Sequence, residues 1–252
     1  MGAALSVVQD RQRFYKYGSD YFRHAILPAC RRLLEEIGIT HSHAAKIFDA
    51  FLKMDTDGSG SITVGEFHRY FGWKRGVFTE RIFDMYAPVR KDDGEPNKMS
   101  YEEFLICVWN YCSYDHQLMA KYVFDIFDID GVKSLSLFEL DALLRMVYIN
   151  QDDDALGAAK ISLRTSFEGA TVTLKSFQET AAANKAILKP AFEIQSRIIE
   201  MTTGEVADGK NCWELYRERR RGKYESTLPD FECNGIRISS SAKSVNEILN
   251  KL

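Results

Sequence analysis

The residues of this chain best suited to chemistry are oxygen-bearing side chains spaced along residues 55–66. The predicted ligands are, in order, Asp55, Asp57, Ser59, Ser61 through its backbone carbonyl, and Glu66. They stand at positions 1, 3, 5, 7 and 12 of a twelve-residue loop. Gly60 occupies position 6, where a chain that wraps around an ion must turn sharply. Three carboxylates with neutral oxygens suit a hard cation that takes six to eight oxygen ligands, so we predict that this loop binds calcium.

Such a loop needs a helix on each side to hold its two ends. Apolar residues at helical spacing precede it at Phe48, Phe51 and Leu52, and the same spacing follows it at 67, 70 and 71. Thr63, at position 9, would contact the ion directly or through a water molecule. The sequence therefore predicts a helix-loop-helix unit.

The end of this loop recurs along the chain at a nearly fixed period. Position 8 is apolar in four places, separated by 37, 36 and 37 residues: Ile62, Met99, Leu135 and Val172. A hydroxyl residue follows each of them, at Thr63, Ser100, Ser136 and Thr173. Such loops pair through a short β-bridge at position 8. We therefore predict a mainly α fold of four helix-loop-helix units in two paired lobes, residues 40–115 and 116–185.

The second and fourth loops lack the side chains that a metal ion needs. In residues 92–103, Gly94 stands at position 3 and Pro96 at position 5, so two side-chain ligands are missing. Residues 165–176 carry no carboxylate at positions 1, 3, 5 or 12. We expect both loops to support the frame without binding calcium.

The third loop, residues 128–139, keeps three carboxylates in register: Asp128, Asp130 and Glu139. Val132 supplies no oxygen at position 5, and Lys133 stands at the position that favours glycine. We expect this loop to bind calcium more weakly than residues 55–66, or not at all.

The four-unit pattern over residues 40–185 resembles the EF-hand superfamily. In layout it is most similar to the calcineurin B regulatory subunits and the neuronal calcium sensors. This resemblance implies an N-terminal myristoyl group, two paired lobes and an apolar groove that grips a helix of a target protein.

Residues 1–39 form a predicted N-terminal helical extension with a lipidation motif. Gly2, followed by Ser6, matches the N-myristoylation pattern. A single acyl chain binds membranes only marginally, and the excess of Lys and Arg over Asp in residues 1–34 would add attraction to anionic lipid. The alternatives are an unmodified start and an amphipathic helix that packs Phe14, Phe22, Ile26 and Leu33 onto the first lobe.

Residues 186–252 form a predicted C-terminal helical extension and tail. Ile194, Ile198 and Met201 make an apolar stripe, either on a core helix or on an internal ligand for the second lobe's groove. The basic segment 210–223 would contact phosphates or a membrane, or form a solvated helix end. Residues 224–252 suggest a loosely ordered tail with a last helix over 245–252.

The composition and the motifs absent from the sequence argue against several classes of protein function. The net charge of −3 argues against a generally nucleic-acid-binding surface, so we expect no nucleic-acid partner. We find no membrane-spanning run, secretory signal, phosphate loop or nucleophile elbow, and the five cysteines lack metal-ligand spacing. We thus expect a non-enzymatic cytoplasmic protein, membrane-associated if Gly2 is acylated. It would couple calcium to binding of a target protein; the alternative is a calcium-independent scaffold that holds a partner helix.

Overall fold

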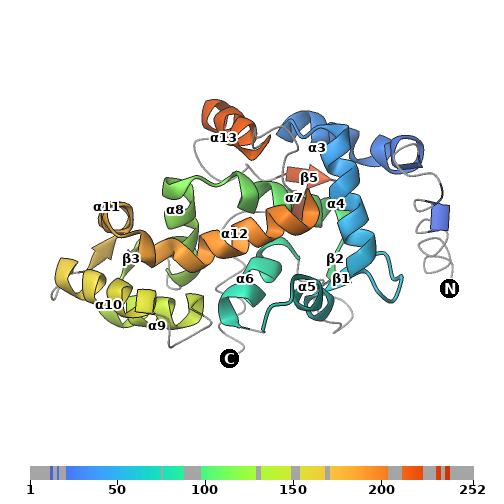
Figure 1. The fold of residues 1–252 in the computed structure, drawn as a ribbon. Coiled ribbons are helices and arrows are strands. Elements are labelled where there is room, and N and C mark those ends of the chain that lie inside the picture. Colours follow the sequence, from blue (N-terminus) through green and yellow to red (C-terminus); the bar gives the residue numbers. More distant parts are fainter. Residues whose placement is uncertain are drawn as a thin grey trace. The chain divides into compact units, whose positions relative to one another are not determined.

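The computed structural model is mainly helical in the residues that it describes, and its strands are two or three residues long (Figure 1). The described residues are 12–13, 16, 21–74, 76–87, 98–128, 132–148, 154–167, 171–203, 212–223, 231–233 and 236–238. The prediction of a mainly α fold is confirmed. Gly2 and Phe14 lie outside the described residues.

The elements follow one another along the chain as helices interrupted by very short strands. Up to residue 113 they are η1 (Phe22–Ile26), α3 (Leu27–Ile37), α4 (His41–Met54), β1 (Ile62–Thr63), α5 (Val64–Phe71), α6 (Val77–Tyr86), β2 (Lys98–Met99) and α7 (Tyr101–Ser113). Next come α8 (His116–Phe127), β3 (Ser134–Leu135), α9 (Leu137–Val147), α10 (Asp154–Ser166), β4 (Val172–Thr173) and α11 (Leu174–Ala183). The last are η2 (Lys185–Leu188), α12 (Lys189–Thr202), α13 (Cys212–Lys223), β5 (Phe231–Cys233) and β6 (Ile236–Ile238).

The strands pair in antiparallel fashion, β1 with β2 and β3 with β4. The facing residues are Ile62 with Met99, Thr63 with Lys98, Ser134 with Thr173, and Leu135 with Val172. The four apolar members of the repeat therefore meet as two pairs, and all four are fully buried. Because facing residues on paired strands share one side of the ladder, the neighbouring polar residues also meet across it.

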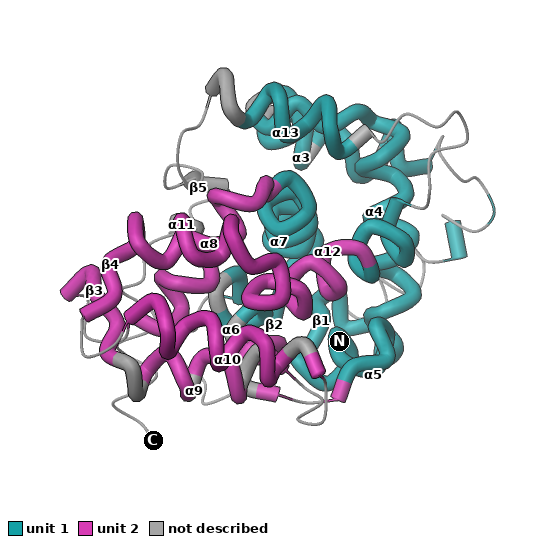
Figure 2. Tube along the Cα trace, turned by 60° about the vertical axis from the view of Figure 1, so that its left-hand side comes forward, with its two compact units in different colours: residues 1–73, 82–113, 197–240 teal, residues 74–81, 114–196, 241–252 magenta. Residues whose placement is uncertain are grey.

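The chain divides into two compact units (Figure 2). Unit 1 comprises residues 1–73, 82–113 and 197–240, and unit 2 comprises residues 74–81, 114–196 and 241–252. Residues 55–66 belong to unit 1, and residues 128–139 belong to unit 2.

Aromatic side chains build the core of unit 1. The ring of Tyr101 at the start of α7 packs edge-on against Phe22, Phe48 and Phe51, with centroids 5.0 to 6.3 Å away. Its hydroxyl donates to the backbone oxygen of Ala44 at 2.9 Å. This packing fixes α4 against α7 and so positions the end of α4, where the loop at residue 55 begins.

Unit 2 is held by α8 and α11, whose rings Phe124 and Phe177 lie 5.9 Å apart. The first part of α12 also packs here. Ile194 is buried, and Gln195 donates from Nε2 to the backbone oxygen of Tyr114 at 3.0 Å. In unit 2, α12 is therefore a core helix.

The C-terminal segment differs from the prediction. Residues 231–233 and 236–238 form an antiparallel pair, β5 with β6, where we expected a loose tail. The sequence holds a hairpin signal here, since Asn234 and Gly235 stand between two short segments in which apolar and charged residues alternate, 231–233 and 236–238. The expected last helix over 245–252 lies outside the described residues.

Candidate metal centre

The loop at residues 55–66 joins α4 to α5 in unit 1. Asp55 caps α4, its backbone N–H donating to the oxygen of Phe51 at 2.9 Å. Gly60 has φ of 82°, in the left-handed region where a side chain is strained, so glycine at position 6 has a structural reason. Thr63 then caps the N-terminus of α5.

The loop brings the three predicted carboxylates together. One ligand oxygen from each of Asp55, Asp57 and Glu66 lies within 4.8 Å of the other two. Asp55 and Glu66 are buried, with 1% and 6% of their surfaces exposed, and Asp57 is open to solvent.

The neutral oxygens of the loop lie beside these carboxylates. Ser59 Oγ donates to the backbone oxygen of Ser61 at 2.9 Å and lies 3.5 Å from Asp55 Oδ1. The set contains oxygen atoms alone, which is the donor chemistry of calcium and magnesium sites. These residues therefore fit a hard divalent cation.

Backbone amides preorganise Asp55. Its Oδ1 accepts from the N–H of Ser59 at 2.9 Å, and its Oδ2 accepts from the N–H of Gly60 at 3.0 Å. Burial nevertheless raises the pKa of Asp55 above its usual value, and neighbouring Asp57 adds to the rise. A bound cation would reverse this effect, because it favours the charged carboxylate.

Asp57 lies close to a positive charge from another loop. Burial alone would raise its pKa, but hydrogen bonds from Ser59 outweigh this effect, and the charge of Lys98 contributes to holding the pKa below its usual value. Lys98 belongs to β2 and faces Thr63 across the strand pair.

Glu66 accepts four hydrogen bonds. Its Oε1 accepts from the N–H and hydroxyl of Thr56 at 2.9 and 2.8 Å, and its Oε2 accepts from the N–H and hydroxyl of Thr63, both at 2.9 Å. Burial alone would raise the pKa of Glu66, but these donors hold it below its usual value. Thr63, which we expected beside the ion, uses its hydroxyl to bond Glu66 and cap α5.

The third loop has the same backbone features as the first. Lys133 has φ of 59°, and its N–H donates to Asp128 Oδ2 at 3.1 Å, as Gly60 does to Asp55. The side chain of Val132 is exposed, and residues 129–131 lie outside the described residues. The described differences from the first loop are therefore in side-chain chemistry and in the strain of a lysine at a left-handed position.

A reciprocal pair of hydrogen bonds joins positions 9 and 12 in all four loops. Position 12 donates its N–H to the hydroxyl of position 9 at 3.2 to 3.3 Å, and its side chain accepts from the N–H of position 9 at 2.6 to 3.0 Å. The pairs are Thr63 with Glu66, Ser100 with Glu103, Ser136 with Glu139, and Thr173 with Ser176. This capping box explains the repeated hydroxyl residue, whether or not a loop has metal ligands.

The basic helix α13 packs one side into unit 1, which the expectation of a solvated or phosphate-binding segment did not foresee, while Arg219 on the same helix is exposed. Arg220 is 1% exposed, and its Nη1 donates to Asn110 Oδ1 at 3.0 Å and to Ser113 Oγ at 2.8 Å. Its guanidinium lies 4.8 Å from the ring centre of Trp109. On the same helix, Tyr216 bonds through its hydroxyl to Nδ1 of His43 at 2.7 Å.

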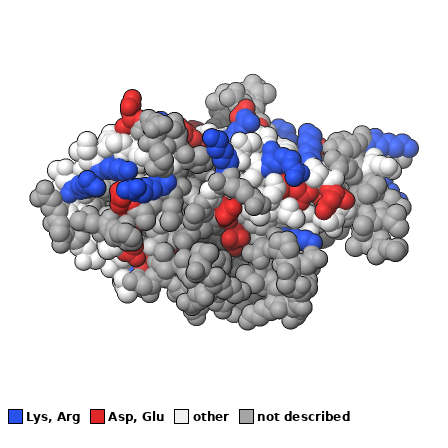
Figure 3. Space-filling model, turned by 90° about the horizontal axis from the view of Figure 1, so that it is seen from below, with Lys and Arg blue, Asp and Glu red and all other residues white. Residues whose placement is uncertain are grey.

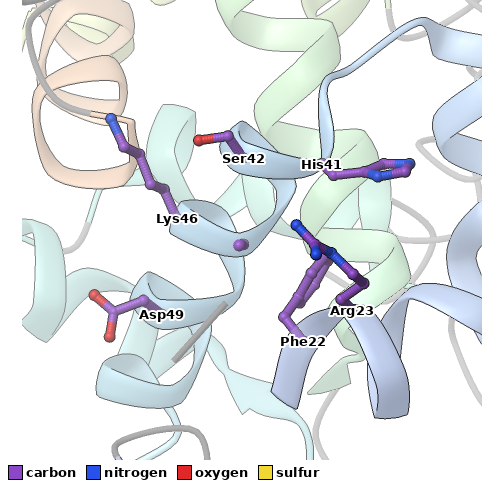
Figure 4. A pocket seen from close by; sticks show the side chains of 7 residues that line it. Phe22, Arg23, His41, Ser42, Lys46 and Asp49 are labelled. Carbon is purple, nitrogen blue, oxygen red and sulfur yellow. The ribbon is translucent and has the colours of Figure 1, made fainter. Parts of the chain in front are cut away.

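A cavity of about 450 Å³ lies beside η1 and α4 in unit 1 (Figure 4). Arg23 and His41 line it with Phe22, and Lys46 and Asp49 lie on α4. No residue of the loop 55–66 lines it. The cavity is therefore separate from the carboxylate site. One of its lining residues, Lys46, donates a hydrogen bond to the backbone oxygen of Thr203 at 3.0 Å.

The described surface charges and cysteines do not indicate a second functional site. In the described part of the face drawn in Figure 3, basic and acidic side chains lie beside one another. The side chains of Cys30, Cys107 and Cys112 are buried, and burial raises the pKa of the Cys107 thiol well above its usual range. None of the described helices is both long and apolar enough to cross a membrane.

Comparison with known proteins finds relatives at weak identity, while no family model matches the chain. It is 26% identical to calcineurin B of Naegleria gruberi over 117 residues, 46% of this chain and 63% of that protein. It is 30% identical to calcineurin B of Candida glabrata over 128 residues, 49% of this chain and 69% of that protein.

A further relative is the gamma form of the B''-type regulatory subunit of serine/threonine-protein phosphatase 2A from Xenopus tropicalis. The identity is 27% over 105 residues, 41% of this chain and 22% of that protein. The chain thus spans less than two thirds of the Naegleria protein and about a fifth of the Xenopus protein.

Proposed function

The chain belongs to the EF-hand superfamily as a relative of calcineurin B, and from this premise we propose that it is a calcium-binding regulatory protein that binds a target protein. The observation that carries the proposal is the convergence of Asp55, Asp57 and Glu66 within 4.8 Å in a loop otherwise lined by neutral oxygens. Such a loop, in sensor proteins, binds calcium with dissociation constants of about 10⁻⁷ to 10⁻⁵ M.

The proposed architecture has four EF-hand units in two lobes. The units are α4 with α5, α6 with α7, α8 with α9, and α10 with α11. The β1–β2 and β3–β4 pairings, with their four buried position-8 residues, support this arrangement. The lobes would span residues 40–115 and 116–185, with helical extensions at 1–39 and 186–252.

In the first lobe, the chain's own residues would link the ion to the helices. Asp55 caps the end of α4, and Glu66 lies in the first turn of α5. A cation held by both would set the distance between these helix ends, and movement of such helices exposes apolar surface in sensor EF-hands. A helix of the target protein would bind that surface.

A calorimetric calcium titration of metal-free protein, with magnesium at its cellular level, tests this proposal. We expect one site near micromolar dissociation constant, abolished by Glu66→Gln. Glu139→Gln is the matched control, because it changes the same position-12 capping glutamate in the third loop. If the titration of the parent chain shows no heat of calcium binding, the proposal is refuted. If the parent shows a second binding step that Glu139→Gln lacks, that step belongs to residues 128–139.

The second candidate function is a calcium-independent scaffold that holds a partner helix. The capping boxes favour it, since Thr173 and Ser176 maintain the helix start in a loop without carboxylate ligands at the expected positions. Fluorescence of a hydrophobic dye separates the two candidates. A sensor exposes dye-binding surface when calcium is added, whereas a scaffold gives the same dye signal and helical circular dichroism with and without calcium.

We also propose a cytoplasmic location, with membrane association through a myristoyl group on Gly2. The support is the sequence motif at residues 2–6. Intact-mass measurement after co-expression with an N-myristoyltransferase tests it, with Gly2→Ala as the control. If the mass of the parent chain shows no myristoyl group, the proposed membrane association through Gly2 is wrong.

A further inference from the structure

We infer that Lys98, from the second loop, acts as a built-in positive charge that weakens cation binding at residues 55–66. This inference rests on the proposed function of that loop. It concerns a residue that supplies no ligand and instead sets the affinity of the site.

The strand register places Lys98 next to the site. Lys98 faces Thr63 in the antiparallel β1–β2 pair. Facing residues of such a pair have their side chains on the same side of the ladder, about 4.5–5.5 Å apart at Cβ. Thr63 points to Glu66, whose Oε2 accepts from the Thr63 hydroxyl at 2.9 Å. Lys98 is therefore directed to the carboxylate side of the strand pair, while Ile62 and Met99 are buried in the core.

The charge of Lys98 acts on one of these carboxylates, that of Asp57. Lys98 is half-buried. Its charge acts on Asp57, an exposed member of the three-carboxylate set. A lysine at this place adds a positive charge beside a set of three carboxylates.

The physical consequence is a competition between two cations. A divalent ion at the carboxylates would be repelled by the ammonium group and would also weaken the ammonium's attraction to Asp57. For partly exposed unit charges about 4 Å apart in water, such a term is about 1 kcal/mol, which corresponds to roughly a 5-fold change in dissociation constant at low salt. It is screened as ionic strength rises, because the Debye length falls from about 30 Å at 0.01 M to about 3 Å at 1 M salt.

The second loop thus has a role although it lacks side-chain ligands at positions 3 and 5. Through β2 it supplies the paired strand, and through Lys98 it supplies a charge to the first loop. The two loops form one electrostatic unit in which the second loop sets the affinity of the first.

Calcium titrations of Lys98→Met and Lys98→Arg test this inference, at about 0.02 M and 0.5 M KCl. Lys98→Met is expected to bind calcium about 5-fold more tightly than the parent at low salt, with the difference falling below about 2-fold at high salt. Lys98→Arg keeps the charge and is expected to match the parent. Lys175→Met, at an exposed lysine of α11, is the control for removing a positive charge elsewhere.

The outcomes separate this inference from the proposed function. Parent and Lys98→Met affinities that agree at low salt, or a gain that persists at 0.5 M KCl, would overturn the role of Lys98 while leaving the calcium site intact. If the parent binds no calcium, the proposed function fails. In that case, calcium binding by Lys98→Met would still support the inference, and a Lys98→Met variant that also binds no calcium would overturn it. Thermal melts of the metal-free variants check that the β1–β2 pairing survives.

Discussion

Replacing Arg220 by methionine tests whether α13 is an integral part of unit 1. Arg220 is 1% exposed and donates two hydrogen bonds from Nη1, to Asn110 Oδ1 and Ser113 Oγ. Its guanidinium also lies over the ring of Trp109. Methionine keeps much of the length and apolar volume of the side chain, so the change removes mainly the polar contacts.

Two opposing terms decide the magnitude. Burying a guanidinium costs several kcal/mol, and methionine relieves that cost. Against this, each hydrogen bond to a charged group contributes about 1.5–3 kcal/mol, and a desolvated cation–π contact contributes about 2 kcal/mol. The substitution also leaves Asn110 buried without the donor that Arg220 supplied, at about 1–3 kcal/mol. We expect Arg220→Met to lower the free energy of unfolding of unit 1 by about 2–3 kcal/mol.

Urea denaturation followed by tryptophan fluorescence measures this change, since Trp109 and Trp213 both belong to unit 1. Arg219→Met is the matched control, because Arg219 is exposed and donates one bond to the oxygen of Gly38 at 2.9 Å. Adding Asn110→Leu to Arg220→Met should recover much of the loss, since the buried amide is removed with its partner. A loss in Arg220→Met no larger than that in Arg219→Met would refute the reasoning.

Three further predictions concern the loops and one histidine. Thr56→Val removes one hydroxyl donor from the position-12 carboxylate of the first loop, so calcium should bind about 3- to 5-fold more tightly in a calorimetric titration; unchanged or weaker binding would contradict this. The double variant Val132→Asp with Lys133→Gly should add a second calcium-binding step to the calorimetric titration. Lys133→Gly alone should raise the free energy of unfolding by about 1 kcal/mol, because it relieves the strain at φ of 59°. A melting temperature at or below that of the parent would count against the strain. Burial, and to a smaller extent the charge of Lys46, lowers the pKa of His43 below 6.5. As the pH falls, the unfolded chain therefore binds this proton before the folded chain does, and the free energy of unfolding decreases below about pH 6.5. His43→Asn should flatten that part of the profile, and an unchanged slope would show that His43 is not its source.

The sequence was sufficient to predict what depends on local spacing. The five predicted ligands follow one another within twelve residues, and the position-8 residues repeat at a near-constant period, so the loop and its pairing partners could be inferred without coordinates. The reason for the repeated hydroxyl was missed, although Thr63 followed three residues later by Glu66 is the sequence pattern of a capping box. The Asn234-Gly235 turn signal was also overlooked.

The position of α13 could not be inferred from the sequence. A run of arginines ordinarily indicates a solvated face, because an isolated buried charge is costly. The groups that make burial of Arg220 tolerable, Asn110 and Ser113, are 110 and 107 residues away along the chain. Nothing local in residues 212–223 distinguishes the buried arginine from its exposed neighbour Arg219.

The capping box of the first loop would give Glu66 two roles if residues 55–66 bind calcium as we propose. A carboxylate has about four lone-pair sites, and Glu66 already accepts four hydrogen bonds from Thr56 and Thr63. A bidentate contact to an ion needs one site on each oxygen, so at least two of these bonds would have to be given up for calcium to bind in this way. The bonds from Thr63 also hold the start of α5, as the equivalent bonds hold the helices after the other three loops. Calcium binding at residues 55–66, as we propose it, would therefore be coupled to the first turn of α5 through Glu66, and a loop whose position 12 is Ser176 keeps the helix start without that coupling.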